Sequence, residues 1–108
     1  MDKRAAVRIP VRARAQFRVE GEGVVIDGLV EDVSRSGLFM SAPRPIDLGS
    51  AAELALDLPG EETLHLKAEV VRVERTPRHG IALRFVGDVE RHRRPLANFI
   101  MRQHSITR

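Results

Sequence analysis

The ten residues 11–20 alternate strictly between apolar and polar side chains. Successive side chains of a β-strand point to opposite faces, so this pattern is typical of a strand with one buried face. The set that we expect to face a core is Val11, Ala13, Ala15, Phe17 and Val19. The set that we expect to face solvent is Arg12, Arg14, Gln16, Arg18 and Glu20.

Five further segments have the composition of short strands, and glycine- or proline-containing turns separate them. They comprise residues 24–33, 38–41, 52–58, 63–75 and 81–85. Gly28 lies inside the second strand and predicts a bulge or bend there. The alternation changes phase at Val70-Val71, which predicts a β-bulge. We therefore expect an all-β fold with a C-terminal helix, in which the strands form a six-stranded antiparallel β-barrel.

The last part of the chain has a helical pattern instead. Leu96, Phe99 and Ile100 have the spacing of one helix face, and Asp88 suits a helix cap. Because proline fits poorly inside a helix, we expect a break near Arg94 with Pro95 in the first turn of the final helix. A single domain over residues 1–108 is predicted, with a flexible ligand-binding loop at 1–10, the barrel at 11–87 and the C-terminal helix at 88–104.

The composition excludes several classes of function. The chain has no cysteine, which removes disulfides, thiolate catalysis and cysteine-ligated zinc, and fits a reducing cytoplasm. No apolar run approaches the about 20 residues that a membrane helix needs. The first residues have no apolar core of a signal peptide, so we expect a cytoplasmic protein.

Charge is distributed unevenly along the chain. Residues 1–18 carry six basic side chains and one acidic side chain. Residues 19–87 carry seven basic and twelve acidic side chains, and residues 88–108 carry five basic and two acidic ones. Basic ends favour an anionic partner, although a solvated charged surface explains them equally well.

Two motifs carry the candidate chemistry. Arg4 and Arg8 have an RxxxR spacing just before the first strand. The planar fork of arginine matches phosphate oxygens and the O6/N7 edge of guanine, although a chain rich in arginine contains such pairs by chance.

The second motif is Asp-Val-Ser-Arg-Ser-Gly at residues 32–37. Asp32 can accept hydrogen bonds from guanine N–H groups, Ser34 can donate and accept, and Gly37 allows a tight turn, with positive φ as one option. The alternative is an ordinary turn in which Asp32 and Ser34 bond to their own backbone.

The combination of RxxxR, one strand, a second strand ending in DxSxxG, and a six-strand pattern resembles the PilZ domain family. The segment at 80–85 is similar to a glycine-led strand of that family, and a C-terminal helix follows in both. The resemblance implies a β-barrel that binds cyclic di-GMP on its outer surface, with no other cofactor. No metal site is expected, because the four histidines lie far apart in the sequence with no carboxylate at ligand spacing. The resemblance assigns ligand contacts to Arg4, Arg8, Asp32, Ser34 and Gly37.

Three other residues are further candidates for the ligand site. Lys3 stands where the family often has an additional arginine, and lysine is a point charge without the planar fork. This difference leaves open whether one or two ligand molecules bind. Arg35 and Arg84 are candidates for extra phosphate contacts, although no motif position assigns them.

The expected function is that of a cyclic di-GMP receptor or effector that changes its N-terminal loop and signals to an unidentified protein. It is not expected to be an enzyme, because Ser34 has no histidine nearby in sequence to activate it. One alternative is a small basic barrel that binds nucleic acid, which the basic ends favour and the absence of Tyr and Trp disfavours. Another is a PilZ-like protein-interaction module without ligand.

Overall fold

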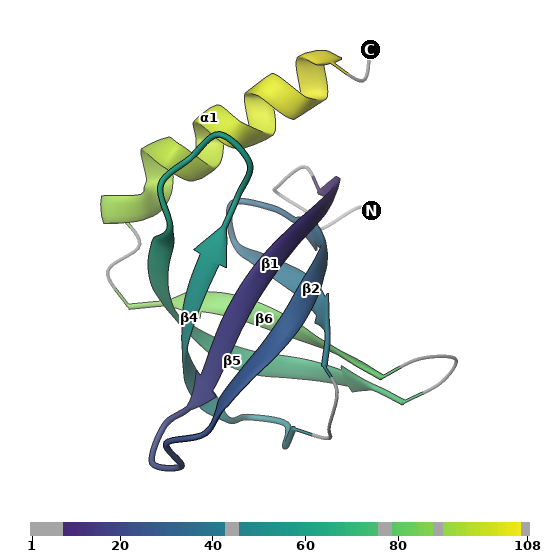
Figure 1. Ribbon diagram of the computed structural model, residues 1–108, viewed down its shortest axis with the longest axis vertical. Helices are drawn as coiled ribbons and strands as arrows, with labels where there is room; N and C mark the ends of the chain where they lie inside the picture. Colours follow the sequence, from purple (N-terminus) through teal and green to yellow (C-terminus); the bar gives the residue numbers. More distant parts are fainter. Residues whose placement is uncertain (1–7, 43–45, 76–78, 88–89, 107–108) are drawn as a thin grey trace, which may run out of the picture.

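The computed structural model describes residues 8–42, 46–75, 79–87 and 90–106. Six strands close into a barrel in the order β1-β2-β3-β6-β5-β4, and all neighbouring strands are antiparallel (Figure 1). The elements are β1 (Ile9–Val19), β2 (Val25–Val33), β3 (Gly37–Ser41), β4 (Ala51–Asp57), β5 (Leu64–Glu74), β6 (Gly80–Val86) and α1 (Glu90–Ile106). The predicted fold class is confirmed.

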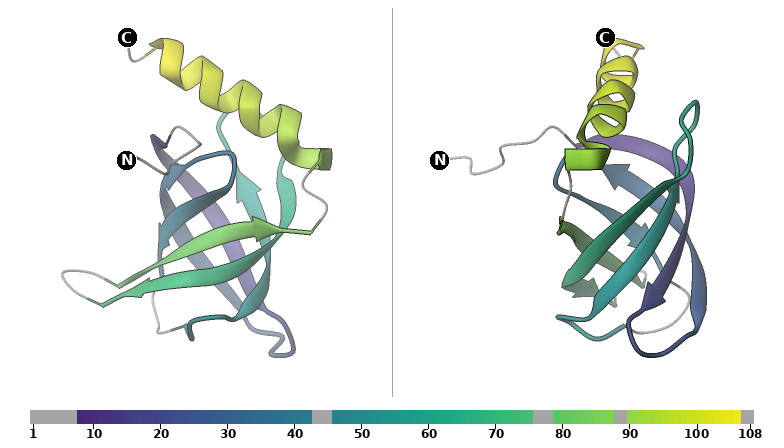
Figure 2. Two further views of the ribbon diagram at one scale, coloured as in Figure 1. Left: turned by 180° about the vertical axis from the view of Figure 1, so that it is seen from behind. Right: turned by 90° about the vertical axis from the view of Figure 1, so that its left-hand side faces the viewer.

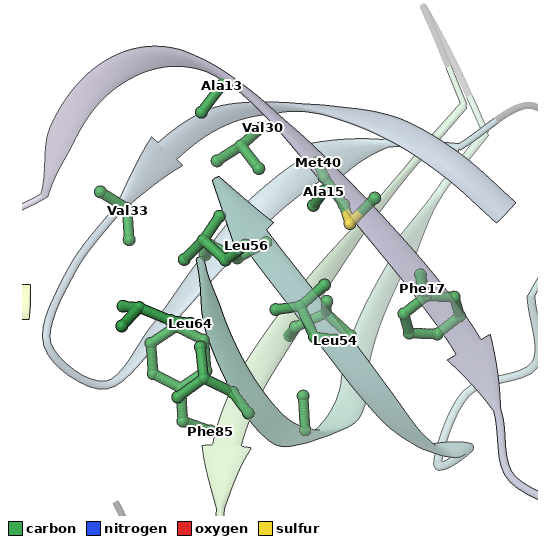
Figure 3. Close-up of a cluster of buried hydrophobic side chains, with 14 of the residues drawn as sticks. Ala13, Ala15, Phe17, Val30, Val33, Met40, Leu54, Leu56, Leu64 and Phe85 are labelled. Carbon is green, nitrogen blue, oxygen red and sulfur yellow. The ribbon is translucent and has the colours of Figure 1, made fainter. Parts of the chain in front are cut away.

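The core lies inside the barrel and consists of the inward-facing set of each strand. On β1, Ala13, Ala15 and Phe17 are buried, as the alternation predicts. They belong to the same core cluster as Leu54 and Leu56 of β4, which is distant in sequence but pairs with β1 (Figure 3). The arginines of β1 are thereby left on the outer surface.

The helix α1 lies across the end of the barrel at which β1 begins (Figures 1 and 2). Its buried face is formed by Leu96, Phe99 and Ile100, as the spacing predicts. Burying this face removes apolar surface from water, and it also closes that end of the barrel. No helix in the described ranges is long and apolar enough to span a membrane.

Two predicted boundaries are wrong. The helix is not broken near Arg94: it runs from Glu90 to Ile106 with Pro95 inside it. Pro95 lies in the second turn, where it removes one backbone hydrogen bond beyond the four that every helix start lacks. Packing of the apolar face on the barrel offsets this loss. Asp88, the expected cap, lies outside the described residues.

The other boundary is the start of the barrel. Strand β1 begins at Ile9, so Ile9 and Pro10 belong to the barrel rather than to a loop over residues 1–10. Ile9 is buried and pairs with Val33, while Pro10 lies near the strand start, where a missing N–H is tolerated. The rest of the expected loop, residues 1–7, lies outside the described residues.

Three β-bulges interrupt the strand pairing. Between Val70 and Arg72 the pairing advances by two residues on β5 and one on β6, which confirms the bulge predicted at Val70-Val71. A second bulge places Glu31 as an extra residue of β2 against β3. The third lies in β1 between Pro10 and Ala13, opposite the same part of β2. Bulges bend a strand and re-aim its side chains, so the adjoining ends of β1 and β2 are locally distorted.

Of the bulge or bend predicted at Gly28, the bulge is wrong, and the bend stays a prediction. Gly28 pairs in regular register with Ala15. A Cβ at this position would overlap Cε of Met40 and lie 2.5 Å from the backbone oxygen of Ser41. Glycine is therefore required here because β2 and β3 approach too closely for a side chain.

We predict that Gly28→Ala lowers the free energy of unfolding by about 1–3 kcal/mol, because the added methyl group overpacks the contact with Met40 and Ser41. Urea denaturation measures this change. The control is Leu29→Ala, which alters the next residue, an exposed one, and should shift stability by only about 0.5 kcal/mol. Equal stability of Gly28→Ala and the wild type would contradict the packing explanation.

Candidate functional site

Arg8 and Asp32, which are 24 residues apart in sequence, form an ion pair on the outer surface of the barrel. The pairing of β1 with β2 places Pro10 opposite Asp32, and Arg8 lies two residues before Pro10, directly ahead of the strand. Arg8 donates from Nε and Nη2 to Oδ1 of Asp32 at 3.2 and 2.9 Å. The side chains are 42% and 32% exposed, so the pair stabilises the fold by only about 0.2–1 kcal/mol.

Both partners retain unused hydrogen-bonding capacity. Within the described part of the chain, no hydrogen bond reaches Oδ2 of Asp32 or leaves Nη1 of Arg8. Among the described residues, the site therefore has an acceptor and donors without partners, close to each other. Such a pair suits a ligand that has both N–H donors and anionic or carbonyl acceptors.

Ser34 lies buried inside the turn that the second motif forms. Among the residues that the structure describes, it is the only buried polar one, at 4% exposed, and its hydroxyl lies inside the turn. Its Oγ accepts hydrogen bonds from the backbone N–H groups of Ser36 and Gly37, both at 3.2 Å. The backbone N–H of Ser34 donates to the carbonyl of Gly37 at 2.8 Å. Ser34 therefore holds the turn together, which is the ordinary-turn alternative for this residue, and its contact with a ligand stays a prediction.

Gly37 joins this turn to β6. It pairs with Arg84, and a Cβ at Gly37 would overlap the carbonyl oxygen of Leu83. Gly37 is not among the glycines with positive φ, so close approach of two backbones, rather than left-handed geometry, requires glycine here. The carbonyl of Ser36 also accepts a hydrogen bond from the N–H of Phe85 at 2.9 Å.

The structure brings most of the predicted site residues to one outer face. Arg8, Asp32 and Gly37 lie at the neighbouring ends of β1, β2 and β3, and Arg84 follows on β6. Arg84 points outward and bonds to Oε1 of Glu69. Arg35 is exposed in the turn and has no hydrogen-bonding or ionic partner among the described residues. Lys3 and Arg4 lie outside the described residues.

Sequence reasoning missed Phe39. It pairs with Asp32 across β2 and β3, and its neighbours Leu38 and Met40 face the core. Phe39 therefore faces outward, yet it is only 4% exposed, and the guanidinium of Arg72 lies 5.8 Å from the centre of its ring. The sequence signal for Phe39 was the run of three apolar residues at 38–40. Because alternate side chains of a strand point to opposite faces, the middle one must face away from the core when its neighbours face it.

No cluster of His, Asp or Glu among the described residues could hold a metal ion. The hydroxyl of Ser34 is buried and hydrogen-bonded within its turn, so it is not presented as a nucleophile.

Comparison with known proteins gives an independent view of the fold. A model of the PilZ domain matches residues 2–102. No curated protein matches the chain significantly. The structure of the Bacillus subtilis inhibitor of motility MotI/DgrA is similar with a TM-score of 0.80 and 21% identity, over 100% of this chain and 55% of that one.

Two structures from Escherichia coli are also similar. YcgR in complex with c-di-GMP has a TM-score of 0.85 and 14% identity, over 99% of this chain and 48% of that one. The PilZ domain of YcgR with c-di-GMP has a TM-score of 0.74 and 13% identity, over 99% of this chain and 95% of that one. This chain spans about half the length of MotI/DgrA and of full YcgR.

These structural likenesses, at low sequence identity, show the fold. The family model matches most of the sequence, including both motifs. From the match over residues 2–102 and the six-stranded barrel closed by a C-terminal helix, we conclude that this chain belongs to the PilZ domain family.

Proposed function

We propose that this chain binds cyclic di-GMP on the outer face of the barrel, where Arg8, Asp32 and the turn ending at Gly37 lie together. The observation that carries the proposal is the ion pair of Arg8 with Asp32, because it joins one residue of each sequence motif. The proposal is supported by family membership and by the E. coli YcgR structures, which contain c-di-GMP.

The geometry suggests a role for each residue. Oδ2 of Asp32 accepts from guanine N–H groups, and the guanidinium of Arg8 binds guanine O6/N7 or a phosphate. The ligand competes with the exposed ion pair, whose loss costs little. Ser34 and Gly37 keep the turn in place, and Arg84 lies opposite Gly37 at the edge of the site. Arg4 and Lys3 would reach the ligand from the N-terminal segment.

We infer further that the protein is an effector rather than an enzyme. Ligand binding changes the N-terminal segment next to β1, and the altered surface signals to a partner protein. One similar structure is that of an inhibitor of motility from B. subtilis, which fits this kind of role. We expect the protein to act in the cytoplasm, where a diffusible nucleotide messenger is made and sensed.

Nucleic-acid binding is the weaker candidate. Its support is the basic character of the chain ends. All four phenylalanines, Phe17, Phe39, Phe85 and Phe99, are buried, so no aromatic ring is presented for stacking on bases. A module that binds protein without any ligand would not need Arg8 and Asp32 to lie side by side.

We predict saturable binding of cyclic di-GMP in a calorimetric titration, and weaker binding by Arg8→Ala. Loss of one bidentate arginine contact should cost about 1–3 kcal/mol, which is about ten- to hundredfold in affinity. Arg18→Ala is the matched control, because Arg18, near the far end of β1, also forms an exposed ion pair, at 2.9 Å from Glu53. GTP should not bind comparably.

The outcome that contradicts the proposal is absence of heat at high ligand concentration. Equal weakening by Arg8→Ala and Arg18→Ala would place the ligand elsewhere. The stoichiometry distinguishes one bound ligand molecule from two, which is the question that Lys3 raises.

The proposed change of the N-terminal segment has its own test. We predict that hydrogen exchange of residues 2–9 slows when cyclic di-GMP is added, because the ligand holds Arg4 and Arg8 against the barrel. Peptide-level mass spectrometry measures this, with β5 as an internal reference. Binding by calorimetry without added protection of residues 2–9 would disprove the conformational mechanism while leaving the binding proposal intact.

A further inference from the structure

A row of outward-facing residues crosses the barrel from the ion pair of Arg8 and Asp32. Strand pairing places Asp32 of β2 beside Phe39 of β3, and Phe39 beside Ala82 of β6. Ala82 has Arg72 of β5 on its other side. Directly opposed residues of antiparallel strands share one face of the sheet, so the row continues the outer face on which the proposed ligand site lies. Strands β5 and β6 face the viewer in the left view of Figure 2.

The ring of Phe39 lies against β6, where the outward-facing residues are small. An added Cβ at Gly80 would overlap Cζ of this ring, and the next outward residue of β6 is Ala82. Although Phe39 points away from the core, it is only 4% exposed. The ring therefore fills the space that Gly80 and Ala82 leave on the outer surface of the barrel.

Arg72 covers the ring of Phe39. Its guanidinium lies 5.8 Å from the ring centre, which is a cation–π distance. Its Nη2 also lies 3.1 Å from Oε2 of Glu74, the next outward residue but one on β5. The ring supports the guanidinium from below and the carboxylate holds it from the side. The Arg72 side chain is nevertheless 56% exposed, so much of it is open to a ligand.

The guanidinium of Arg72 reaches back toward the proposed ligand site. Arg72 starts on β5, three strands from Asp32, which corresponds to about 14 Å at the usual strand spacing. Its guanidinium lies instead over the ring of Phe39, whose strand is the direct neighbour of the strand that carries Asp32. A planar cation is therefore held beside the carboxylate that would accept from guanine.

We propose that the guanidinium of Arg72 is a stacking platform for the guanine base whose edge Asp32 binds. The inference rests on the proposed binding of cyclic di-GMP, and it adds a contact with the face of the base to the edge contacts of the two motifs. Guanidinium groups stack on bases as they stack on aromatic rings. The covered ring of Phe39 supports the platform and does not itself contact the base.

The contact depends on a flat surface rather than on net charge. Glu74 balances the charge of Arg72, so attraction of an anionic ligand does not explain the arrangement. Stacking is tolerant of base identity because every base has a π-face, whereas the carboxylate of Asp32 requires N–H donors at the base edge. Arg72 therefore contributes affinity, and Asp32 contributes the preference for guanine.

The test compares three replacements of Arg72 in calorimetric titrations of the full chain with cyclic di-GMP. Arg72→Ala should weaken binding at least about fivefold, because a base stack is lost. Arg72→Lys should be equally weak, since lysine keeps the charge and lacks the flat face. Arg72→Trp should restore most of the affinity, because an indole ring also stacks on bases.

The tryptophan variant gives a second readout. The chain contains no tryptophan, so the fluorescence of Arg72→Trp comes from this position alone. A stacked guanine should quench it over the same ligand concentrations at which heat is released. Arg102→Trp should not be quenched.

Arg102→Ala is the matched control for affinity. Arg102 of α1 also covers a phenylalanine, at 5.9 Å from the ring centre of Phe99, and pairs with Glu61 at 2.6 Å beside the turn between β4 and β5. Its replacement should leave ligand affinity unchanged, and thermal unfolding verifies that every variant is folded.

Three results would overturn the platform. They are wild-type affinity in Arg72→Ala, recovery of affinity by Arg72→Lys, and failure of Arg72→Trp to bind more tightly than Arg72→Ala or to be quenched at saturation. If Arg8→Ala is weakened and Arg72→Ala is not, only this inference fails. Absence of binding by the wild type would overturn the proposed function and the platform together.

Discussion

The site depends on the hydrogen bonds that the buried hydroxyl of Ser34 makes within its turn. The hydroxyl binds the backbone of Ser36 and Gly37, and the turn so formed is fixed to β6 through the carbonyl of Ser36 and the close approach of Gly37 to Leu83. This contact joins β3 to β6, so the same turn helps to close the barrel and to position Asp32 at its rim. A buried, fully bonded hydroxyl costs little free energy, whereas an unbonded one would cost about 1–3 kcal/mol.

The outer surface carries two groups of arginines that differ in their partners. In one, Arg8 is paired with Asp32 beside the turn, and Arg84 with Glu69. In the other, Arg12 and Arg14 have no partner among the described residues and border an exposed leucine. Both groups lie near the start of β1, since Arg8 directly precedes the strand and Arg12 lies on it.

Much of the fold could be predicted because each strand carries its own signal. The alternation on β1 identified the buried Phe17, and the apolar pair Val70-Val71 revealed a bulge. The bulge at Glu31 had a signal too, the spacing of three between inward-facing Val30 and Val33. The need for glycine at positions 28 and 37 could not be predicted. The atoms that exclude a side chain there belong to neighbouring strands, which come close only when the chain folds. The helix break predicted at Pro95 was wrong, because packing of α1 on the barrel overrides the tendency of proline to interrupt a helix.

The site was predicted in composition more than in geometry. The motifs named Arg8 and Asp32, but their direct contact depends on the register of β1 against β2. The most direct test of the account is an NMR titration with cyclic di-GMP. We expect one saturable set of amide shifts at Arg8, at residues 32–37 and at Arg84, with Gln16 and Arg18 unmoved. Absence of shifts, or shifts centred on Gln16 and Arg18, would contradict the assignment of the ligand to the turn that Ser34 holds together.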